Sequence, residues 1–368
     1  MIFSKNKSPK KLNFNRSKKP LLAFVIAFAV TGGAYLAYRS FAYTNTTVVA
    51  TFVSYVNAKT RLYTLTASGQ MKELTAVTNS YVSPRDPDLS NNGQRIVFSS
   101  SYGLRIIDSN GANLRTLTPD HRAGYPSFSP SGNKIAYYDN KAKGGGIYVM
   151  NADGTGKRRL LAVNGIYGSK IKWSSDGKYI MSFVPENYTN NIKPGLYRIN
   201  TKTASYKRLI TVTNFRYGYY LHDVSVNKIL YSQTDRVEDV KRLQTLRVDG
   251  TGGKTLTRLG KWSSGTAVFS PNASTAFFIE YSDAHRLLKV NVDSKRVSSV
   301  VADWNPSHQD DIQNIAYTGD KTSLIVFNTA RTGTVGTNQF VLVKPDGTSV
   351  SKIFWQPQAT YSIWGPGF

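Results

Sequence analysis

The chain has 368 residues, of which 47 are Lys or Arg and 22 are Asp or Glu, so its formal net charge at pH 7 is +25. It contains no cysteine, which excludes disulfide bonds and thiolate chemistry. An excess of positive charge favours polyanionic neighbours, and the position of the charges along the chain indicates which ones.

Residues 1–19 form a basic tail that contains seven cations and no acidic residue. Residues 20–38 carry no charge and are almost wholly apolar. As a helix they would reach roughly 28 Å, close to the thickness of a bilayer's hydrocarbon core. This pattern predicts a transmembrane helix over 20–38, followed by a linker over 39–47.

The distribution of charge around this segment predicts its orientation. Cations on one side of a span stay in the cytoplasm, so we expect a single-pass, N-in protein of the cell membrane with residues 48–368 outside the cytoplasm. Ser40-Phe41-Ala42 could instead be a signal-peptide cleavage site, which would make the protein secreted. The apolar run is longer than a typical signal core, which favours a retained anchor. The basic tail over 1–19 directly precedes the predicted transmembrane helix. Its cations are therefore explained by membrane orientation and by attraction to anionic lipid headgroups, so we do not expect nucleic acid as a partner.

A repeated pattern fills residues 48–368. An aromatic or aliphatic anchor is followed by a turn rich in Ser, Pro, Asp, Asn and Gly, and then by segments with the two-residue period of strands. The anchors are spaced 39 to 51 residues apart, and a period near forty with several strands per unit is typical of a β-propeller blade. They are Leu89, Phe128, Trp173, Val224, Phe269, Tyr317 and Trp364.

The clearest copy runs from Tyr125 to Gly154. It reads Tyr-Pro-Ser-Phe-Ser-Pro-Ser-Gly, then an apolar strand, then Ile147-Tyr148-Val149-Met150-Asn151-Ala152-Asp153-Gly154. This pattern resembles the TolB-type β-propeller repeat, a relative of WD repeats. The resemblance implies an all-β propeller. It also implies, as one alternative function, an accessory role in envelope assembly or transport.

The two ends of the repeat region predict how the ring closes. Residues 48–75 supply a second, third and fourth strand with no first, whereas residues 361–367 supply a first strand and its turn with nothing after them. Together they complete one blade, and the shared sheet removes the free edges of the ring. We therefore expect seven blades, six continuous and one composite. The fourth, around Val224, has lost both the aromatic anchor and the Gly.

The loops that enter each first strand should lie at the mouth of the central channel. Tyr and Arg are favoured at protein interfaces, and His with carboxylates could form a metal or acid–base site. None of the His and Asp positions has tight ligand spacing. We therefore expect binding residues rather than catalytic residues, a metal or a cofactor. The binding residues predicted on this face are His121, Arg122, Arg216, Tyr217, Tyr219, His308, Asp310 and Asp311.

Three further residues are placed near the same axis. His222 is expected within a first strand, lining the channel or making a structural hydrogen bond, and Asp86 and Asp88 come just before the first complete blade's anchor. The His and Asp residues of the channel mouth, His121 and His308 with Asp310 or Asp311, leave a propeller hydrolase or lyase as an alternative.

The region predicted to be exported keeps a large positive charge. Eight of the 47 basic residues lie at or before Arg39, which leaves 39 against 22 acidic residues, a net charge of +17. The sequence thus predicts a non-catalytic binding or scaffold module whose partner is an envelope protein or an anionic cell-surface polymer.

Overall fold

The structure is a computed structural model, and all the regular structure that it describes is β-strand. It describes residues 47–56, 59–74, 83–119, 122–140, 145–163, 170–184, 191–212, 218–235, 240–259, 266–281, 285–300, 310–318, 321–332, 335–348, 350–355 and 364–367. The predicted transmembrane segment at 20–38 lies outside these residues. Within the described ranges, no helix is long and apolar enough to cross a membrane.

The strands form seven four-stranded antiparallel sheets, each taken as one blade. Blade 1 is β4 (Arg85–Leu89), β5 (Arg95–Ser100), β6 (Gly103–Asp108) and β7 (Arg115–Thr116). Blade 2 is β8 (Ala123–Phe128), β9 (Lys134–Asp139), β10 (Gly146–Asn151) and β11 (Arg158–Ala162). Blade 3 is β12 (Lys172–Trp173), β13 (Tyr179–Val184), β14 (Gly195–Asn200) and β15 (Tyr206–Thr211). Blade 4 is β16 (Tyr219–Ser225), β17 (Lys228–Asp235), β18 (Val240–Arg247) and β19 (Lys254–Leu259).

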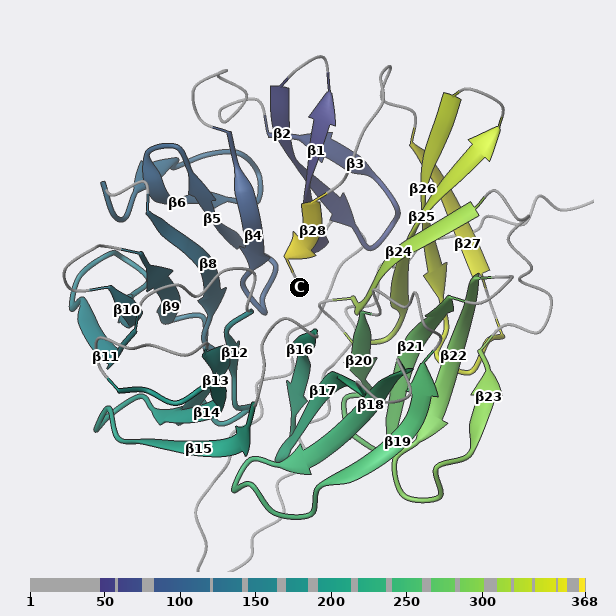
Figure 1. Cartoon of the computed structure of the whole chain (residues 1–368). Helices are drawn as coiled ribbons and strands as arrows, with labels where there is room; N and C mark the ends of the chain where they lie inside the picture. Colours follow the sequence, from purple (N-terminus) through teal and green to yellow (C-terminus); the bar gives the residue numbers. More distant parts are fainter. Residues whose placement is uncertain are drawn as a thin grey trace, which may run out of the picture. The chain divides into compact units, whose positions relative to one another are not determined.

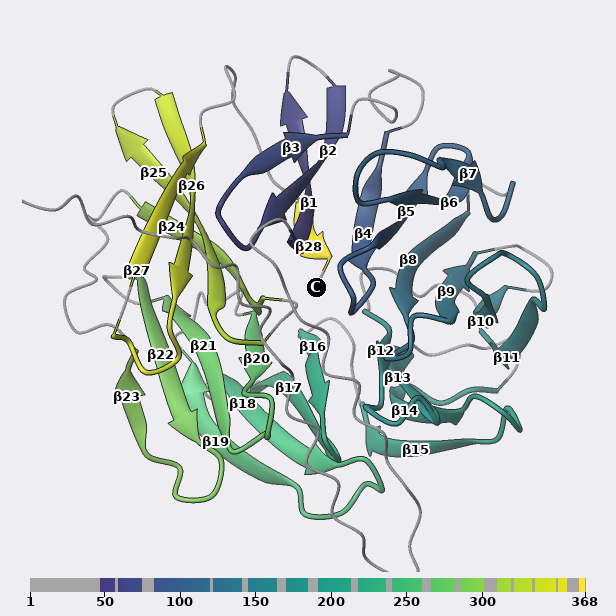
Figure 2. The same cartoon turned by 180° about the vertical axis from the view of Figure 1, so that it is seen from behind.

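The remaining blades follow the same order, with one exception. Blade 5 is β20 (Ala267–Phe269), β21 (Thr275–Tyr281), β22 (His285–Asn291) and β23 (Val297–Ser299). Blade 6 is β24 (Asp310–Tyr317), β25 (Leu324–Thr332), β26 (Val335–Val343) and β27 (Val350–Trp355). The composite blade is β28 (Trp364–Gly367), β1 (Val48–Val56), β2 (Lys59–Thr66) and β3 (Met71–Glu73). Figures 1 and 2 show the seven sheets around a common centre, with the first strand of each innermost.

The composite blade confirms the predicted closure. β28 pairs with β1, and Trp364 lies opposite Val53 and Gly367 opposite Thr51. The prediction was wrong in one detail, because it placed residues 365–367 in a turn after the strand. They belong to the strand itself. Pro366 fits the position of β28, which has a neighbour on one side only, because proline within sheets is confined to edge strands and bulges.

The core of the ring lies between the blades. Along β9, Ile135 and Tyr137 pack into one cluster with Val97 of blade 1, while Ala136 and Tyr138 pack into another with Trp173 of blade 3. Alternate residues of a strand point to opposite faces, so each central strand is buried against both neighbouring blades.

The turn after each anchor explains the repeated Ser and Gly. A Ser or Thr hydroxyl accepts a hydrogen bond from the backbone N–H five residues later in blades 1, 2, 3, 5 and 6, as Ser129 does from Lys134 at 3.1 Å. One turn residue has a positive φ, which suits Gly and is less favourable for other residues. It is Gly93, Gly132, Gly177, Ala273 or Lys321. Blade 4 has a shorter turn between the paired Ser225 and Lys228, which is why its motif is lost.

Candidate functional site

The structure describes the predicted channel-mouth residues only in part. His121, Arg216, Tyr217 and His308 lie outside the described residues, and the side chains of Asp310 and Asp311 are likewise not described. Whether the eight come together is therefore not tested.

Three of these positions need a correction. Tyr219, Asp310 and Asp311 belong to strands β16 and β24 rather than to loops, because the first strands of blades 4 and 6 extend further than the short β12 and β20. Tyr219 is half-buried, and its ring lies 5.7 Å from that of Phe183 in blade 3. It thus takes part in packing between blades. Arg122 is exposed and lies directly before β8.

A group of ionisable residues gathers on and beside the innermost strands of blades 1, 3 and 4. We call it the inner-strand cluster: Asp86, Asp88, Lys170, Lys172, His222 and Asp223. Its members act on one another electrostatically across blades, since Lys170 influences the carboxyl groups of Asp86 and Asp88 and the imidazole of His222. The sequence analysis missed Lys170, Lys172 and Asp223. The signal that could have found them is their place in the repeat, one or three residues before an anchor.

Two carboxylates of this cluster tie neighbouring blades together. Oδ2 of Asp88 accepts the backbone N–H of Phe128 in blade 2 at 2.6 Å, and Oδ2 of Asp223 accepts that of Phe269 in blade 5 at 2.9 Å. Asp88 and Asp223 each precede an anchor, so the same inter-blade bond recurs at two junctions. Burial raises the pKa of Asp88 to about 6, against the opposing effects of this hydrogen bond and of Lys172 and Lys170.

Asp86 is likewise engaged. Its Oδ2 accepts a hydrogen bond from the hydroxyl of Ser99 at 3.0 Å, and the backbone of Tyr125 also bonds to it. Burial raises its pKa. Asp86 has a φ of 47°, an uncommon value for a residue other than Gly, in an irregular stretch of β4.

Lys170 and His222 have polar atoms without partners. The Lys170 side chain is accessible, yet it has no hydrogen bond or ion pair within the described part of the chain. Burial lowers the pKa of Lys170 to about 8, helped by the like charge of Lys172 and opposed by the carboxylates of Asp223, Asp86 and Asp88. His222 is 9% exposed, and its Nε2 has no hydrogen-bond partner. Burial lowers the pKa of His222 to about 3, with Lys170, Lys241 and Lys172 adding to the effect, so the imidazole is neutral at pH 7.

A second set of cations lies on the outermost strands and joins blades at five successive junctions. In each, a Lys or Arg of the fourth strand donates a hydrogen bond to the turn between the third and fourth strands of the next blade. The pairs are Lys72 with Asn110 O, Arg115 with Asp153 O, Arg158 with Thr201 O, Lys207 with Asp249 O and Lys254 with Asp293 Oδ1. These five cations therefore hydrogen-bond mainly to backbone carbonyl oxygens, which carry no formal charge and do not neutralise them.

Two outer cations are not used in this way. Arg159 and Arg208 follow the joining cations Arg158 and Lys207 directly, so their side chains emerge on the opposite faces of β11 and β15. Both are exposed, and neither has a hydrogen bond or ion pair in the described ranges. They occupy equivalent positions in adjacent blades, opposite Tyr148 and Tyr197.

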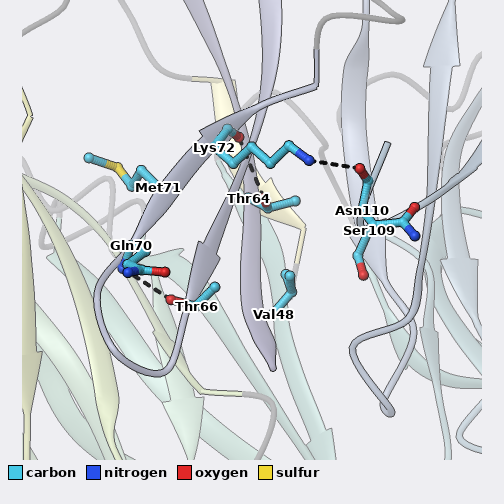
Figure 3. Close-up of a pocket in the computed structure, with 8 residues that line it drawn as sticks. All are labelled: Val48, Thr64, Thr66, Gln70, Met71, Lys72, Ser109 and Asn110. Carbon is cyan, nitrogen blue, oxygen red and sulfur yellow. Dashed lines mark hydrogen bonds between the residues drawn. The ribbon is translucent and has the colours of Figure 1, made fainter. Parts of the chain in front are cut away.

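An open pocket of about 660 Å³ lies between the outer part of the composite blade and blade 1 (Figure 3). Lys72 crosses it, with Nζ 2.9 Å from the carbonyl oxygen of Asn110, and the backbone N–H of Gln70 bonds to Thr66 Oγ1 at 3.0 Å. Several of the polar groups that line this pocket bond to one another. Among the described residues, no group of three or more His, Cys, Asp or Glu is arranged to hold a metal.

No protein-family model matches the chain. Solved structures do resemble it. A puromycin hydrolase S511A mutant complexed with PGG has 12% sequence identity over 86% of this chain and 53% of its own, with a TM-score of 0.63. An oligogalacturonate lyase in complex with manganese has 12% identity over 83% of this chain and 85% of its own, with a TM-score of 0.56. The chain is a seven-bladed β-propeller.

These likenesses show the fold alone, because the identities are low. The chain spans about half the length of the puromycin hydrolase. TolB from Acinetobacter baumannii is also similar, with 12% identity over 84% of this chain and 78% of its own and a TM-score of 0.48.

Proposed function

We propose that this propeller is a membrane-anchored, extracytoplasmic and non-catalytic binding module for an anionic cell-surface polymer. Residues 20–38 would be the anchor, and the basic tail over 1–19 would stay in the cytoplasm. What supports this topology is the uncharged apolar stretch and the cations before it.

Arg159 and Arg208 carry the proposal for the ligand. The neighbouring Arg158 and Lys207 are engaged in joining blades, whereas these two guanidinium groups are exposed at equivalent positions of adjacent outer strands. A guanidinium group presents a planar fork of donors that matches carboxylate and phosphate oxygens. A single exposed ion pair contributes at most about 1 kcal/mol, so useful affinity requires a polymer that contacts several cations at once.

The rest of the fold keeps these cations at a fixed spacing. The sheet shared by β28 and β1, together with the cations that join successive blades, holds the outer strands in place before a ligand arrives. A preorganised surface loses less conformational entropy on binding.

The experiment is retention of the full-length protein, in detergent, on immobilised heparin as a model polyanion. We expect retention at low salt that fades towards physiological ionic strength, because exposed charges are screened over about 8 Å at 0.15 M salt. The double variant Arg159→Gln/Arg208→Gln should elute at clearly lower salt.

The matched control is Arg158→Gln/Lys207→Gln, which removes the same two charges from the same strands. It should lower the unfolding temperature more and retention less. An equal loss of retention in the two variants would mean that only net charge matters. Salt-insensitive binding to envelope extracts, with no retention on heparin, would indicate a protein partner instead.

The topology has its own test. Protease added to intact expressing cells should digest the propeller and leave an epitope fused to the tail protected inside. Digestion of the tail, with the propeller protected, would reverse the proposed orientation.

A further inference from the structure

We infer that the pocket between the composite blade and blade 1 binds an acidic sugar, a ligand with one carboxylate or phosphate group and several hydroxyl groups. The pocket has a volume of about 660 Å³ (Figure 3). Small-molecule sites usually measure roughly 300–1,000 Å³. It lies on other blades than Arg159 and Arg208, so the inference does not depend on the function proposed for them.

Lys72 supplies the positive charge of this pocket. Among the described residues that line it, Lys72 alone carries a formal charge. Its side chain is exposed, and Nζ donates one hydrogen bond of 2.9 Å to the carbonyl oxygen of Asn110. It has no other partner in the described ranges. An ammonium group has three donors, so two remain for a ligand, and an anionic acceptor makes the stronger hydrogen bond.

The turn that meets Lys72 lacks a carboxylate that most of the equivalent turns have. In three of the other four junctions the turn residue that meets the joining cation is an aspartate. These are Asp153, Asp249 and Asp293. Asn110 takes their place in blade 1.

The exchange of aspartate for asparagine leaves the turn itself unchanged. Oδ1 of Asn110 accepts the backbone N–H of Ala112 at 2.9 Å, as Oδ1 of Asp153 accepts that of Thr155 at 2.9 Å. What is lost is a negative charge beside the cation, and what is gained is the Nδ2 donor of the amide.

The carboxylate that this turn does contain faces blade 2. Along β6, Ile107 packs with Val48 of the composite blade, whereas Ile106 packs into the cluster that includes residues of blade 2. Asp108 has the alternation of Ile106, and its Oδ2 accepts the side-chain amide of Asn113 at 2.7 Å. It therefore does not offset the charge of Lys72 in the pocket.

Neutral groups supply the rest of the site. The side-chain amide of Gln70, the hydroxyl of Ser109 and Nδ2 of Asn110 have no hydrogen-bond partner within the part of the chain that the structure describes. Such groups can donate to or accept from the hydroxyls of a sugar. Val48 and Met71 add apolar surface for its C–H groups. A wholly apolar ligand would leave the polar groups unsatisfied, and a cation would meet the like charge of Lys72.

The test is titration calorimetry on the full-length protein in a detergent without a sugar headgroup, with glucuronate, glucose 6-phosphate and glucose as probes. We expect saturable binding of an acidic sugar and binding of glucose that is at least about tenfold weaker, because charge-assisted hydrogen bonds are the stronger ones. The acidic sugar with the lower dissociation constant identifies carboxylate or phosphate as the preferred group.

Asn110→Asp is the most specific variant, because it restores the aspartate of the other junctions and keeps the turn. It should fold as wild type and bind the preferred acidic sugar at least about tenfold more weakly, since the new carboxylate pairs with Lys72 and repels the ligand. Asp249→Asn makes the reverse exchange at an equivalent junction and should leave binding unchanged.

A second pair of variants isolates the cation. Lys72→Gln and Lys207→Gln each remove a cation that joins two blades, so they share any effect on stability. Lys72→Gln should abolish the preference for the acidic sugar over glucose, whereas Lys207→Gln should keep it. The inference is overturned if no acidic sugar binds, if glucose binds as tightly, if Asn110→Asp binds as wild type does, or if the two lysine variants behave alike.

Discussion

Asp88 of blade 1 and Phe128 of blade 2 are joined by a hydrogen bond of 2.6 Å, donated by the backbone N–H of Phe128 to Oδ2 of the carboxylate. The same bond joins Asp223 to Phe269, from blade 4 to blade 5. The sequence places Asp88 near the channel mouth and gives no sign of Asp223, but the geometry gives both carboxylates the same role of holding blades together.

Asp88→Ala should therefore destabilise the propeller. It leaves the Phe128 N–H without its acceptor, at a cost of about 2 kcal/mol in the free energy of unfolding. Asp88→Asn keeps an acceptor and removes a charge that burial disfavours, so it should be at least as stable as wild type at pH 7. Urea unfolding measures both. If Asp88→Asn is as damaging as Asp88→Ala, then the charge itself is what the site requires.

The pH dependence of stability should depend on His222. Its pKa is lowered to about 3 in the folded state by burial and by Lys170, Lys241 and Lys172. As the pH falls below about 6.5 the unfolded chain takes up this proton first, so stability is lost, by about 2 kcal/mol at pH 5. His222→Gln removes this loss.

Asp88 acts in the opposite direction. Because its pKa is raised to about 6, the penalty for its charge is present above pH 6 and disappears as the pH falls towards 4. Between pH 6 and 4 the two effects oppose each other in wild type. His222→Gln should gain stability on acidification and Asp88→Asn should lose it, which thermal unfolding across this range measures. Parallel curves for the three proteins would contradict both assignments.

Two turn glycines with the same backbone conformation should differ in their tolerance of a side chain. Gly93 and Gly132 have φ of +69° and +70°. A Cβ at Gly132 would meet no atom closer than 3.7 Å, so Gly132→Ala should cost only the conformational penalty, about 1 kcal/mol. At Gly93 a Cβ would lie 2.3 Å from the carbonyl oxygen of Val48 in the composite blade. Gly93→Ala should therefore cost about 3 kcal/mol, since overpacking adds a further 1–3 kcal/mol.

Urea unfolding of the two alanine variants under the same conditions measures this difference. Equal costs would mean that blade 1 and the composite blade do not approach as closely as the structure shows.

The sequence predicts the blades well because their signals are local. The turn after the anchor needs a hydroxyl at Ser129 and a residue that tolerates positive φ at Gly132. Because these two residues lie within four positions of each other, the repeat can be recognised from a short stretch of sequence. The composite closure was predictable for the same reason, since residues 48–75 visibly lack a first strand.

The inner-strand cluster could not be predicted so easily. Lys170, His222 and Asp88 are far apart in sequence, and only the ring brings them within electrostatic reach. The distinction between Arg158, which joins blades, and Arg159, which does not, also depends on the register of the outer strand with the next blade's turn. Composition gives the total charge but cannot separate these roles.

Closure of the ring by Trp364 and Val53 is the claim on which the blade geometry depends, and the absence of cysteine allows a direct measurement. Directly opposite residues of antiparallel strands have Cα atoms about 4.5–5.5 Å apart, within the range that a disulfide spans. Mild oxidation of the full-length Val53→Cys/Trp364→Cys variant should form an intramolecular disulfide, seen as faster migration on a non-reducing gel and loss of both thiols. The control, Val53→Cys/Lys178→Cys, should keep both thiols free. Failure of the first pair to crosslink, or equal crosslinking of the two pairs, would contradict the closed ring.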